Sequence, residues 1–266
     1  MKTIAWITDI HFDHLTPDEI GRFIRNLEDT QPDVVLIGGD TATAQRIQSD
    51  LEMIAEILQR PIYFVLGNHD FYGGSIAATY GALKVISQQS NWLHWLPASG
   101  VVTLTERVGL IGHGCFADGR LGRAEQSQIL FNDYFHIDEF VRVGQKQRFA
   151  LMNELGNQAA AMVRKALSEA VEQYPTLYLL THVPPFREAC WYEGRITHDE
   201  FLPHLSCKAV GDVLLEIMAA HPECNLTVLC GHTHGSGEAQ MLPNLKTITG
   251  GAVYGNPQLQ PLLYID

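Results

Sequence analysis

The stretch PDVVLIGGD, residues 32–40, decides the fold of this chain. A run of β-branched and aliphatic residues stands between a proline and two glycines, which is typical of a strand buried on both faces. The stretch PIYFVLGNHD, residues 61–70, repeats this pattern, and KTIAWITDI, residues 2–10, precedes both. Helical apolar spacing over residues 16–30 and 47–60 separates the three predicted strands. Strands that alternate with helices of this length indicate βαβ units and a largely parallel sheet, so we expect an α/β fold.

The rest of the chain continues the alternation less regularly. Residues 100–114 have the pattern of two short strands joined by a tight turn, which indicates antiparallel pairing. Further elements are predicted at 75–90 (helix), 145–173 (helix), 176–186 (strand), 208–221 (helix) and 225–235 (strand). The tail, residues 239–266, is expected to add closing antiparallel strands.

No repeat, low-complexity tract or linker divides the chain, so we expect a single domain over residues 1–266. Residues 114–148 mix glycine, arginine, aromatic and acidic residues without a sustained period. Long irregular segments inside compact domains often act as lids or binding loops. We therefore predict that residues 114–148 form a lid or substrate loop insertion.

The composition argues against several classes of partner. Hydrophobic residues make up 46% of the 266 residues and charged residues 18%, as in an ordinary globular domain. The net charge of −12 repels polyanions, which disfavours nonspecific binding to nucleic acid or to an anionic membrane surface. No apolar stretch approaches the length that spans a bilayer, and the first residues lack the features of a signal peptide. The five cysteines are scattered without any CxxC, which indicates neither a disulfide framework nor a zinc ribbon, so we predict a cytoplasmic protein.

Side chains of the types that bind metals stand at the ends of the predicted strands. They are Asp9, His11, Asp40, Asn68, His182, His232 and His234. In open α/β sheets, ligands bind outside the carboxyl ends of the strands, so five segments would bring oxygen and nitrogen donors to one edge. Spacing i, i+2 on an extended segment would direct Asp9 and His11 to one side, and likewise the two histidines of GHTH.

Each of these motifs also has a simpler structural interpretation. Histidine is often a hydrogen-bonded structural residue, Asp40 could cap the following helix, and Asn68 could belong to a turn. These interpretations do not account for donor side chains at all five strand ends. We therefore predict a metal site.

The ordered set D-x-H, G-D, G-N-H-D, H and G-H-x-H, which runs from Asp9 to His234, resembles the calcineurin-like metallophosphoesterases. The resemblance implies a four-layer α/β/β/α sandwich, in which two mixed β-sheets are flanked by helices. It also implies hydrolysis of a phosphomono- or phosphodiester by attack of a metal-bridging hydroxide. The implied ligands are Asp9, His11 and His234 for one ion, Asn68, His182 and His232 for the other, and Asp40 as the bridge.

The donor set indicates which metals such a site would take. Imidazole nitrogens mixed with oxygens suit Mn, Fe or Zn, and also Ni or Co, better than Mg or Ca, so we expect two divalent or trivalent ions. The two oxygens of the Asp40 carboxylate could each bind one ion. Two cations about 3.5–4 Å apart would clamp a phosphate and lower the pKa of a shared water. Their charge would attract phosphate in spite of the net charge of −12.

Two residues beside the predicted ligands are candidate catalytic residues. The resemblance implies that His69 is not a ligand but stabilises phosphoryl charge or protonates the leaving oxygen. Asp70 could orient His69 or cap the next helix. The protein Ser/Thr phosphatases of this superfamily continue GDxxDRG and have GNHE, whereas this chain has GGDTATAQ and GNHD. Activity on phosphoproteins is therefore disfavoured. The residue that orients the histidine in those enzymes has no counterpart here. The motifs are more similar to those of the small-molecule phosphodiesterase and bacterial phosphatase branches.

Candidate substrate-binding residues carry weaker signals. They are His113, Arg120, Arg123, Phe186 and Arg187, of which the arginines could bind phosphate or carboxylate or simply be solvated. The expected substrate is a small metabolite or a nucleotide. A nuclease of the same superfamily is disfavoured by the net charge, and a catalytically silent metal-binding module by the intact His69. The sequence does not indicate an oligomeric state.

Overall fold

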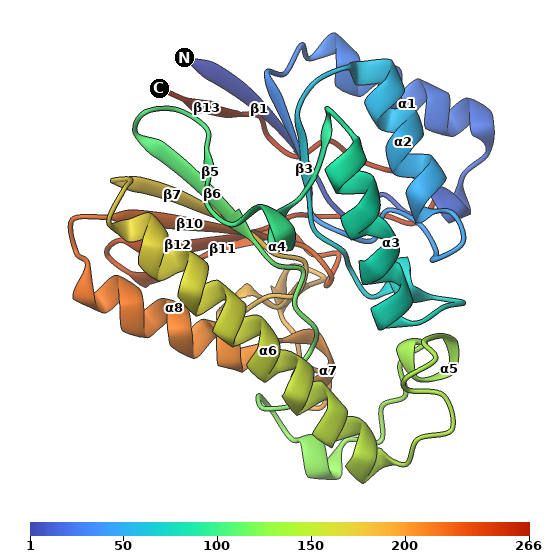
Figure 1. Cartoon of the computed structure of the whole chain (residues 1–266). Helices are drawn as coiled ribbons and strands as arrows, with labels where there is room; N and C mark the ends of the chain where they lie inside the picture. The colour runs from blue at the N-terminus through green and yellow to red at the C-terminus, as the bar shows by residue number, and fades with distance from the viewer.

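Two β-sheets lie at the centre of the molecule, which the computed structural model describes over residues 1–266 (Figure 1). The order of the five-stranded sheet is β13 (Leu263–Ile265), β1 (Lys2–Ile7), β2 (Val34–Ile37), β3 (Ile62–Phe64) and β4 (Leu93–Trp95). The order of the six-stranded sheet is β11 (Gly237–Leu242), β12 (Leu245–Thr249), β10 (Asn225–Cys230), β7 (Thr176–Leu180), β6 (Val108–Gly112) and β5 (Val102–Thr103). Both sheets are mixed, because antiparallel pairs join β13 to β1, β11 to β12 and β5 to β6 while the other pairs are parallel.

Helices flank both sheets, and this confirms the predicted four-layer α/β/β/α sandwich. The helices beside the five-stranded sheet are α1 (Pro17–Asp29), α2 (Ile47–Leu58) and α3 (Ile76–Gln89), and those beside the six-stranded sheet are α6 (Gln145–Val171) and α8 (Lys208–Ala220) (Figure 1). The short elements are α4 (Leu96–Ser99), α5 (Asp133–His136), α7 (Leu202–Leu205), the hairpin of β8 (Trp191–Tyr192) and β9 (Arg195–Ile196), and the 3-10 helices η1 (Phe12–His14), η2 (His69–Phe71), η3 (Ala124–Gln126) and η4 (Arg187–Ala189). None of the helices has both the length and the apolar character needed to cross a membrane.

Local sequence signals account for where two of the helices begin. The hydroxyl of Thr16 accepts the amide of Glu19, whose carboxylate accepts the amide of Thr16, and Pro17 takes the first helical position of α1. Ser75 caps α3 by accepting the amide of Ala78 at 3.1 Å. These bonds satisfy backbone amides that the first helical turn leaves without a partner.

Alternation along the strands divides the apolar core between two layers. In β1, Ile4 and Trp6 belong to the cluster between the sheets, whereas Ala5 and Ile7 belong to the cluster beneath the helices. Strands β2, β6, β7 and β10 divide their residues in the same way. Because both faces of each strand are buried, the strands appear in the sequence as continuous apolar runs.

The C-terminal tail forms antiparallel strand pairs, as expected, and adds one parallel pair. β12 pairs in parallel with β10, and the antiparallel partner of β12 is β11. β13 then joins the other sheet, where it pairs with β1. The parallel pair of β12 with β10 was not predicted, because apolar alternation is the same in parallel and antiparallel strands and does not encode strand direction.

The irregular segment 114–148 is in part packed into the core. Its residues Tyr134, Ile137 and Phe140 are buried in the larger apolar cluster, and Ile137 forms an isolated bridge with Gly74. Its irregular backbone is interrupted by η3 and α5, and α6 begins within its last residues, at Gln145. The action of this segment as a lid stays a prediction.

Candidate metal centre

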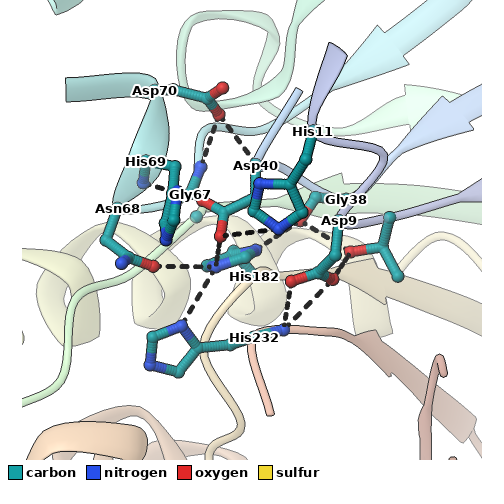
Figure 2. Close-up of polar contacts among 12 residues, drawn as sticks. Asp9, His11, Gly38, Asp40, Gly67, Asn68, His69, Asp70, His182 and His232 are labelled. Atoms are coloured by element: carbon teal, nitrogen blue, oxygen red, sulfur yellow. Dashed lines mark hydrogen bonds and ion pairs between the residues drawn. The ribbon is translucent and has the colours of Figure 1, made fainter. Parts of the chain in front are cut away.

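The predicted ligands lie in turns that follow five strands, and the six that Figure 2 labels point toward a common centre. The five strands are β1, β2, β3, β7 and β10, which come from both sheets. His11 and His234, which are 223 residues apart in the sequence, approach within 3.2 Å at their Nε2 atoms. The carboxyl ends of the strands of two stacked sheets thus bring distant segments together, whereas the expectation was of one sheet edge.

The backbone is left-handed at five of the seven predicted ligands. The φ angle is 53° at Asp9, 44° at His11, 51° at Asp40, 70° at His232 and 60° at His234. The two i, i+2 pairs are therefore not extended, and the expectation that strand alternation aligns their side chains was wrong. Left-handed conformations cost non-glycine residues about 1–3 kcal/mol and gather at functional sites.

Two glycines allow the ligand turns to approach one another closely. A Cβ on Gly231 would collide with Oδ2 of Asp9, and a Cβ on Gly67 would collide with Oδ1 of Asp40. A side chain at either position would therefore displace a carboxylate. The glycines that begin GHTH and GNHD are required by this packing.

Asp9, His11 and His234 form the first donor group. Nε2 of His234 lies 3.2 Å from Nε2 of His11 and 3.5 Å from Oδ1 of Asp9. Atoms that bind one ion at about 2.1 Å stand about 3.0–3.5 Å from one another, so these separations fit a shared metal ion.

Asn68, His182 and His232 form the second donor group. Nε2 of His182 lies 3.1 Å from Oδ1 of Asn68 and 3.2 Å from Nδ1 of His232. The other nitrogen of each ring faces a backbone carbonyl, at 3.0 Å for His182 with Gly38 and at 3.2 Å for His232 with His204. A histidine that donates its N–H to a carbonyl presents its unprotonated nitrogen to a metal, so both rings are held in the metal-binding tautomer.

Asp40 lies between the two donor groups and faces both with the same oxygen. Its Oδ2 is 3.9 Å from Nε2 of His11 and 3.4 Å from Nε2 of His182. Its Oδ1 accepts the backbone amide of His69 at 2.8 Å. The geometry favours Oδ2 as the shared ligand atom, whereas the expectation was of one oxygen for each ion.

Burial and the two carboxylates set the protonation of the donors. Burial lowers the pKa of His11 and of His232 to about 4, so both rings are neutral and able to bind a metal. Burial also lowers the pKa of His182, but the carboxylates of Asp40 and Asp9 outweigh it and raise that pKa to about 10. Burial raises the pKa of both carboxylates, yet the neighbouring His182 brings each below its ordinary value. Two buried anions thus attract a proton where a metal cation would bind, and the residues present fit a pair of ions.

A family model for calcineurin-like phosphoesterases matches residues 2–236. The chain belongs to the calcineurin-like phosphoesterase family. It is a metal-dependent hydrolase of phosphoesters, and the family implies a dinuclear metal centre, for which the donor groups are the candidate ligands. No curated protein matches the sequence.

Two solved structures share the fold of this phosphoesterase. A phosphopantetheinyl hydrolase from Mycobacterium tuberculosis is 17% identical, with a TM-score of 0.64 over 94% of this chain and 89% of that chain. A dimetal phosphatase from Danio rerio is 15% identical, with a TM-score of 0.58 over 94% of this chain and 87% of that chain. At these identities the likeness shows the fold alone.

In this phosphoesterase, His69 lies beside the first donor group. Its ring stacks on Tyr72 with the centroids 4.2 Å apart, and meets the ring of His11 edge-on at 4.6 Å. One ring nitrogen of His69 lies within 4.8 Å of donor atoms of His11 and Asp40. The hydroxyl of Tyr254 is 3.5 Å from Nε2 of His69, and no carboxylate is hydrogen-bonded to the ring. The half-buried imidazole therefore faces the metal centre without an acidic partner.

Asp70 is fully buried and binds the backbone of two ligand turns. One carboxylate oxygen accepts the amides of Asp40 and Gly67 at 2.9 and 2.8 Å, and the other accepts those of Thr41 and Ala42 at 2.8 and 3.0 Å. Neither oxygen is hydrogen-bonded to the adjacent imidazole, and none of the four amides belongs to a helix. Burial, with a contribution from Asp40, raises the pKa of Asp70 to about 7. The geometry is that of a residue that joins the two turns.

A cavity of about 440 Å³ opens beside His232 and His234. Aromatic side chains and one arginine form much of its wall: Phe131, Tyr192, Phe201, Tyr254 and Arg195. None of these residues was predicted, because no motif marks them: Tyr192 and Arg195 come from the short β8–β9 hairpin and the others from loops. Only the aromatic and basic composition of the stretch WYEGR, residues 191–195, could have pointed to one of these segments.

The five predicted substrate-binding residues do not line this cavity. Arg120 pairs with the buried Asp118 at 2.9 Å, whereas Arg187 and Arg123 lie 2.5 and 3.7 Å from Asp199. Phe186 is buried against Gly211, and Nδ1 of His113 accepts the amide of Cys115 at 2.9 Å. Each of these side chains is occupied by contacts within the protein.

Proposed function

We propose that this phosphoesterase hydrolyses a phosphomono- or phosphodiester of a small metabolite or nucleotide, with two ions of Mn, Fe or Zn. The observation that carries the proposal is the pair of donor groups that share Oδ2 of Asp40 beside a cavity of about 440 Å³. The proposed ligands are Asp9, His11 and His234 for one ion, Asn68, His182 and His232 for the other, and Asp40 for both.

Bound ions would neutralise the phosphate and lower the pKa of a water between them, which supplies the attacking hydroxide. His69, whose ring meets that of His11, would protonate the leaving oxygen or stabilise phosphoryl charge. Its backbone amide holds Oδ1 of Asp40, so that Oδ2 stays directed at both donor groups. Asp70 would contribute by holding the turn of Asp40 against that of Gly67.

The cavity wall supports a substrate with a flat or apolar group and a second anionic group. Tyr192 and Tyr254 offer aromatic faces against which a ring would pack. The guanidinium of Arg195 lines the cavity and forms no ion pair, in contrast to Arg187, which is bound to Asp199. A free guanidinium can bind a phosphate or carboxylate through two parallel hydrogen bonds.

The alternatives are a nuclease and a catalytically silent metal-binding module. The net charge of −12 disfavours the nuclease, and the position of His69 beside the donor groups disfavours the silent module. We also propose a cytoplasmic location, which is supported by five buried cysteines that are all free thiols.

Removal and restoration of the metals tests the proposed activity. We expect the protein reloaded with Mn, Fe or Zn to hydrolyse p-nitrophenyl phosphate or its bis-ester, and the chelator-treated protein to hydrolyse neither. Asp40→Asn should reduce kcat about 100-fold or more and lower the metal content, because it weakens the ligand that both sites share. The proposal fails if the loaded protein hydrolyses neither ester and Asp40→Asn keeps its metal. Cleavage of single-stranded DNA would instead support the nuclease.

A further inference from the structure

Asp133 is a buried acid that reaches a proposed metal ligand from the irregular segment 114–148. It lies at the start of α5, and 3% of its surface is exposed. Its Oδ1 accepts a hydrogen bond of 2.7 Å from Nδ2 of Asn68 and one of 2.6 Å from the hydroxyl of Tyr72. No motif in the sequence marks this residue, and the phosphoester chemistry described above does not use it.

The bond to Asp133 determines which end of the Asn68 amide faces the metal centre. A side-chain amide has two orientations of nearly the same shape, but only its oxygen can bind a cation. Oδ1 of Asp133 accepts two hydrogen bonds and donates none, so it binds the NH₂ end of Asn68 and repels the oxygen. As a result, Oδ1 of Asn68 lies 3.1 Å from Nε2 of His182, within the second donor group (Figure 2).

The same carboxylate also supports the ring on which His69 stacks. Tyr72 donates its hydroxyl to Asp133, and its ring lies 4.2 Å from that of His69 with 27° between the planes. No carboxylate is hydrogen-bonded to the ring of His69, so this stacked pair is one of the contacts that orient it. Asp133 therefore holds two residues that flank His69, and it is not one of the residues that line the cavity.

We propose that Asp133 is a positioning residue, which selects the metal-binding orientation of Asn68 and holds Tyr72 against His69. The inference rests on the proposed ligand set. It gives the segment 114–148 a part in assembling the metal centre.

The substitution Asp133→Asn tests the selection of the amide orientation. The new side chain has the same shape, but its amide pairs with either orientation of Asn68. We expect the affinity for the ion of the second donor group (Asn68, His182 and His232) to fall about 10–100-fold, the effect typical of groups that orient a ligand. The affinity for the ion of the first donor group should change less than about threefold. Calorimetric titration of the metal-free protein with Mn²⁺ measures both affinities, and mass spectrometry after gel filtration measures the ions retained per chain.

A matched control separates positioning from loss of a buried acid. Asp118 lies in the same segment and is fully buried, but it binds Arg120 and the amide of Ala209 rather than a ligand. Asp118→Asn should therefore lower the unfolding temperature and leave both metal affinities within about threefold of those of the unaltered protein.

Exchange of the two side chains provides a rescue. In Asn68→Asp alone, two carboxylates would face each other where the 2.7 Å bond now lies, and second-ion affinity should fall. In the double variant Asn68→Asp with Asp133→Asn, the new amide donates to the new carboxylate, and second-ion affinity should recover to within about tenfold. This variant also decides the question if Asp133→Asn alone does not fold.

The outcomes distinguish this inference from the proposed function. If the unaltered protein binds fewer than two ions, the proposed ligand set is wrong. If Asp133→Asn binds both ions as tightly as the unaltered protein does, only the inference is overturned. The same holds if the exchange variant binds the second ion no more tightly than Asn68→Asp.

Discussion

At the scale of the residue, the two histidines of GHTH present different ring nitrogens to different donor groups. His232 directs Nδ1 to His182 at 3.2 Å, because its Nε2 faces the carbonyl of His204. His234 directs Nε2 to His11 at 3.2 Å. The backbone is left-handed at both positions, and this one motif contributes to both donor groups.

Arg195 is the residue by which substrate binding can be tested separately from metal binding. We expect Arg195→Gln to reduce kcat/KM for carboxyphenyl phosphate about 10-fold or more, mainly through KM, and that for phenyl phosphate less than about twofold. The reason is that a hydrogen bond to a charged group contributes about 1.5–3 kcal/mol to binding. Phenyl phosphate has no carboxylate to form this bond, so its binding does not depend on the guanidinium.

The control for Arg195→Gln is Arg107→Gln, at an exposed arginine in the turn between β5 and β6. This control should leave both substrates unaffected. Steady-state kinetics that show equal losses for the two esters in Arg195→Gln, or no loss for either, would contradict the proposed role of the guanidinium.

At the scale of the element, the β8–β9 hairpin is seated on the glycines that follow GHTH. A Cβ on Gly235 would collide with the carbonyl of Trp191, and a Cβ on Gly237 would collide with its indole ring. The hairpin carries Tyr192 and Arg195 into the cavity wall. The glycines thus let a substrate-binding element pack directly against the turn that carries two proposed metal ligands.

Substitution of Gly237 by alanine should disturb the β8–β9 hairpin and leave the metal content of the protein unchanged. Because the indole of Trp191 must move, we expect the free energy of unfolding to fall by about 1–3 kcal/mol and KM to rise, with unchanged ions per chain. Denaturant unfolding, kinetics and metal analysis measure these quantities. The control is Gly81→Ala in α3, where a Cβ meets no atom within 4 Å and stability should be kept or increased. Loss of metal with KM unchanged would show that the hairpin is not the element affected.

At the scale of the whole molecule, the stability of the metal-free protein should fall as the pH rises. Burial lowers the pKa of His182, but Asp40 and Asp9 outweigh it and raise this pKa from 6.5 to about 10. A group whose pKa is higher in the folded state stabilises the fold fully below pH 6.5 and loses that contribution as the pH approaches 10. A bound ion replaces the proton, so the metal-loaded protein should show a smaller change.

Thermal unfolding with and without a chelator measures this difference over the interval from pH 6.5 to 10. We expect the unfolding temperature of the chelated protein to fall more steeply across the interval. Parallel curves for the two states would mean that His182 does not exchange a proton for a metal.

The sequence by itself determined the layered α/β architecture and the segments that carry the proposed ligands. Apolar runs such as Val34–Ile37 mark strands buried on both faces, and a run of this kind depends only on neighbouring residues. Donor side chains directly after such runs gather at the carboxyl end of their own sheet, where the ends of parallel strands meet, and the stacking of the two sheets brings the two groups together. Both inferences use contacts that are local in the sequence or are imposed by the fold class.

Only the tertiary structure decided how the site is assembled in detail. The single oxygen of Asp40 that faces both donor groups, the bond from Asn68 to Asp133, and the place of Arg195 in the cavity wall each depend on turns brought together from distant positions. The arginines predicted to bind substrate show this, because Arg120 and Arg187 pair with acidic residues that no sequence motif indicates. Side-chain pairing of this kind is determined by how the loops pack in three dimensions, and it cannot be inferred from the spacing of residues in the sequence.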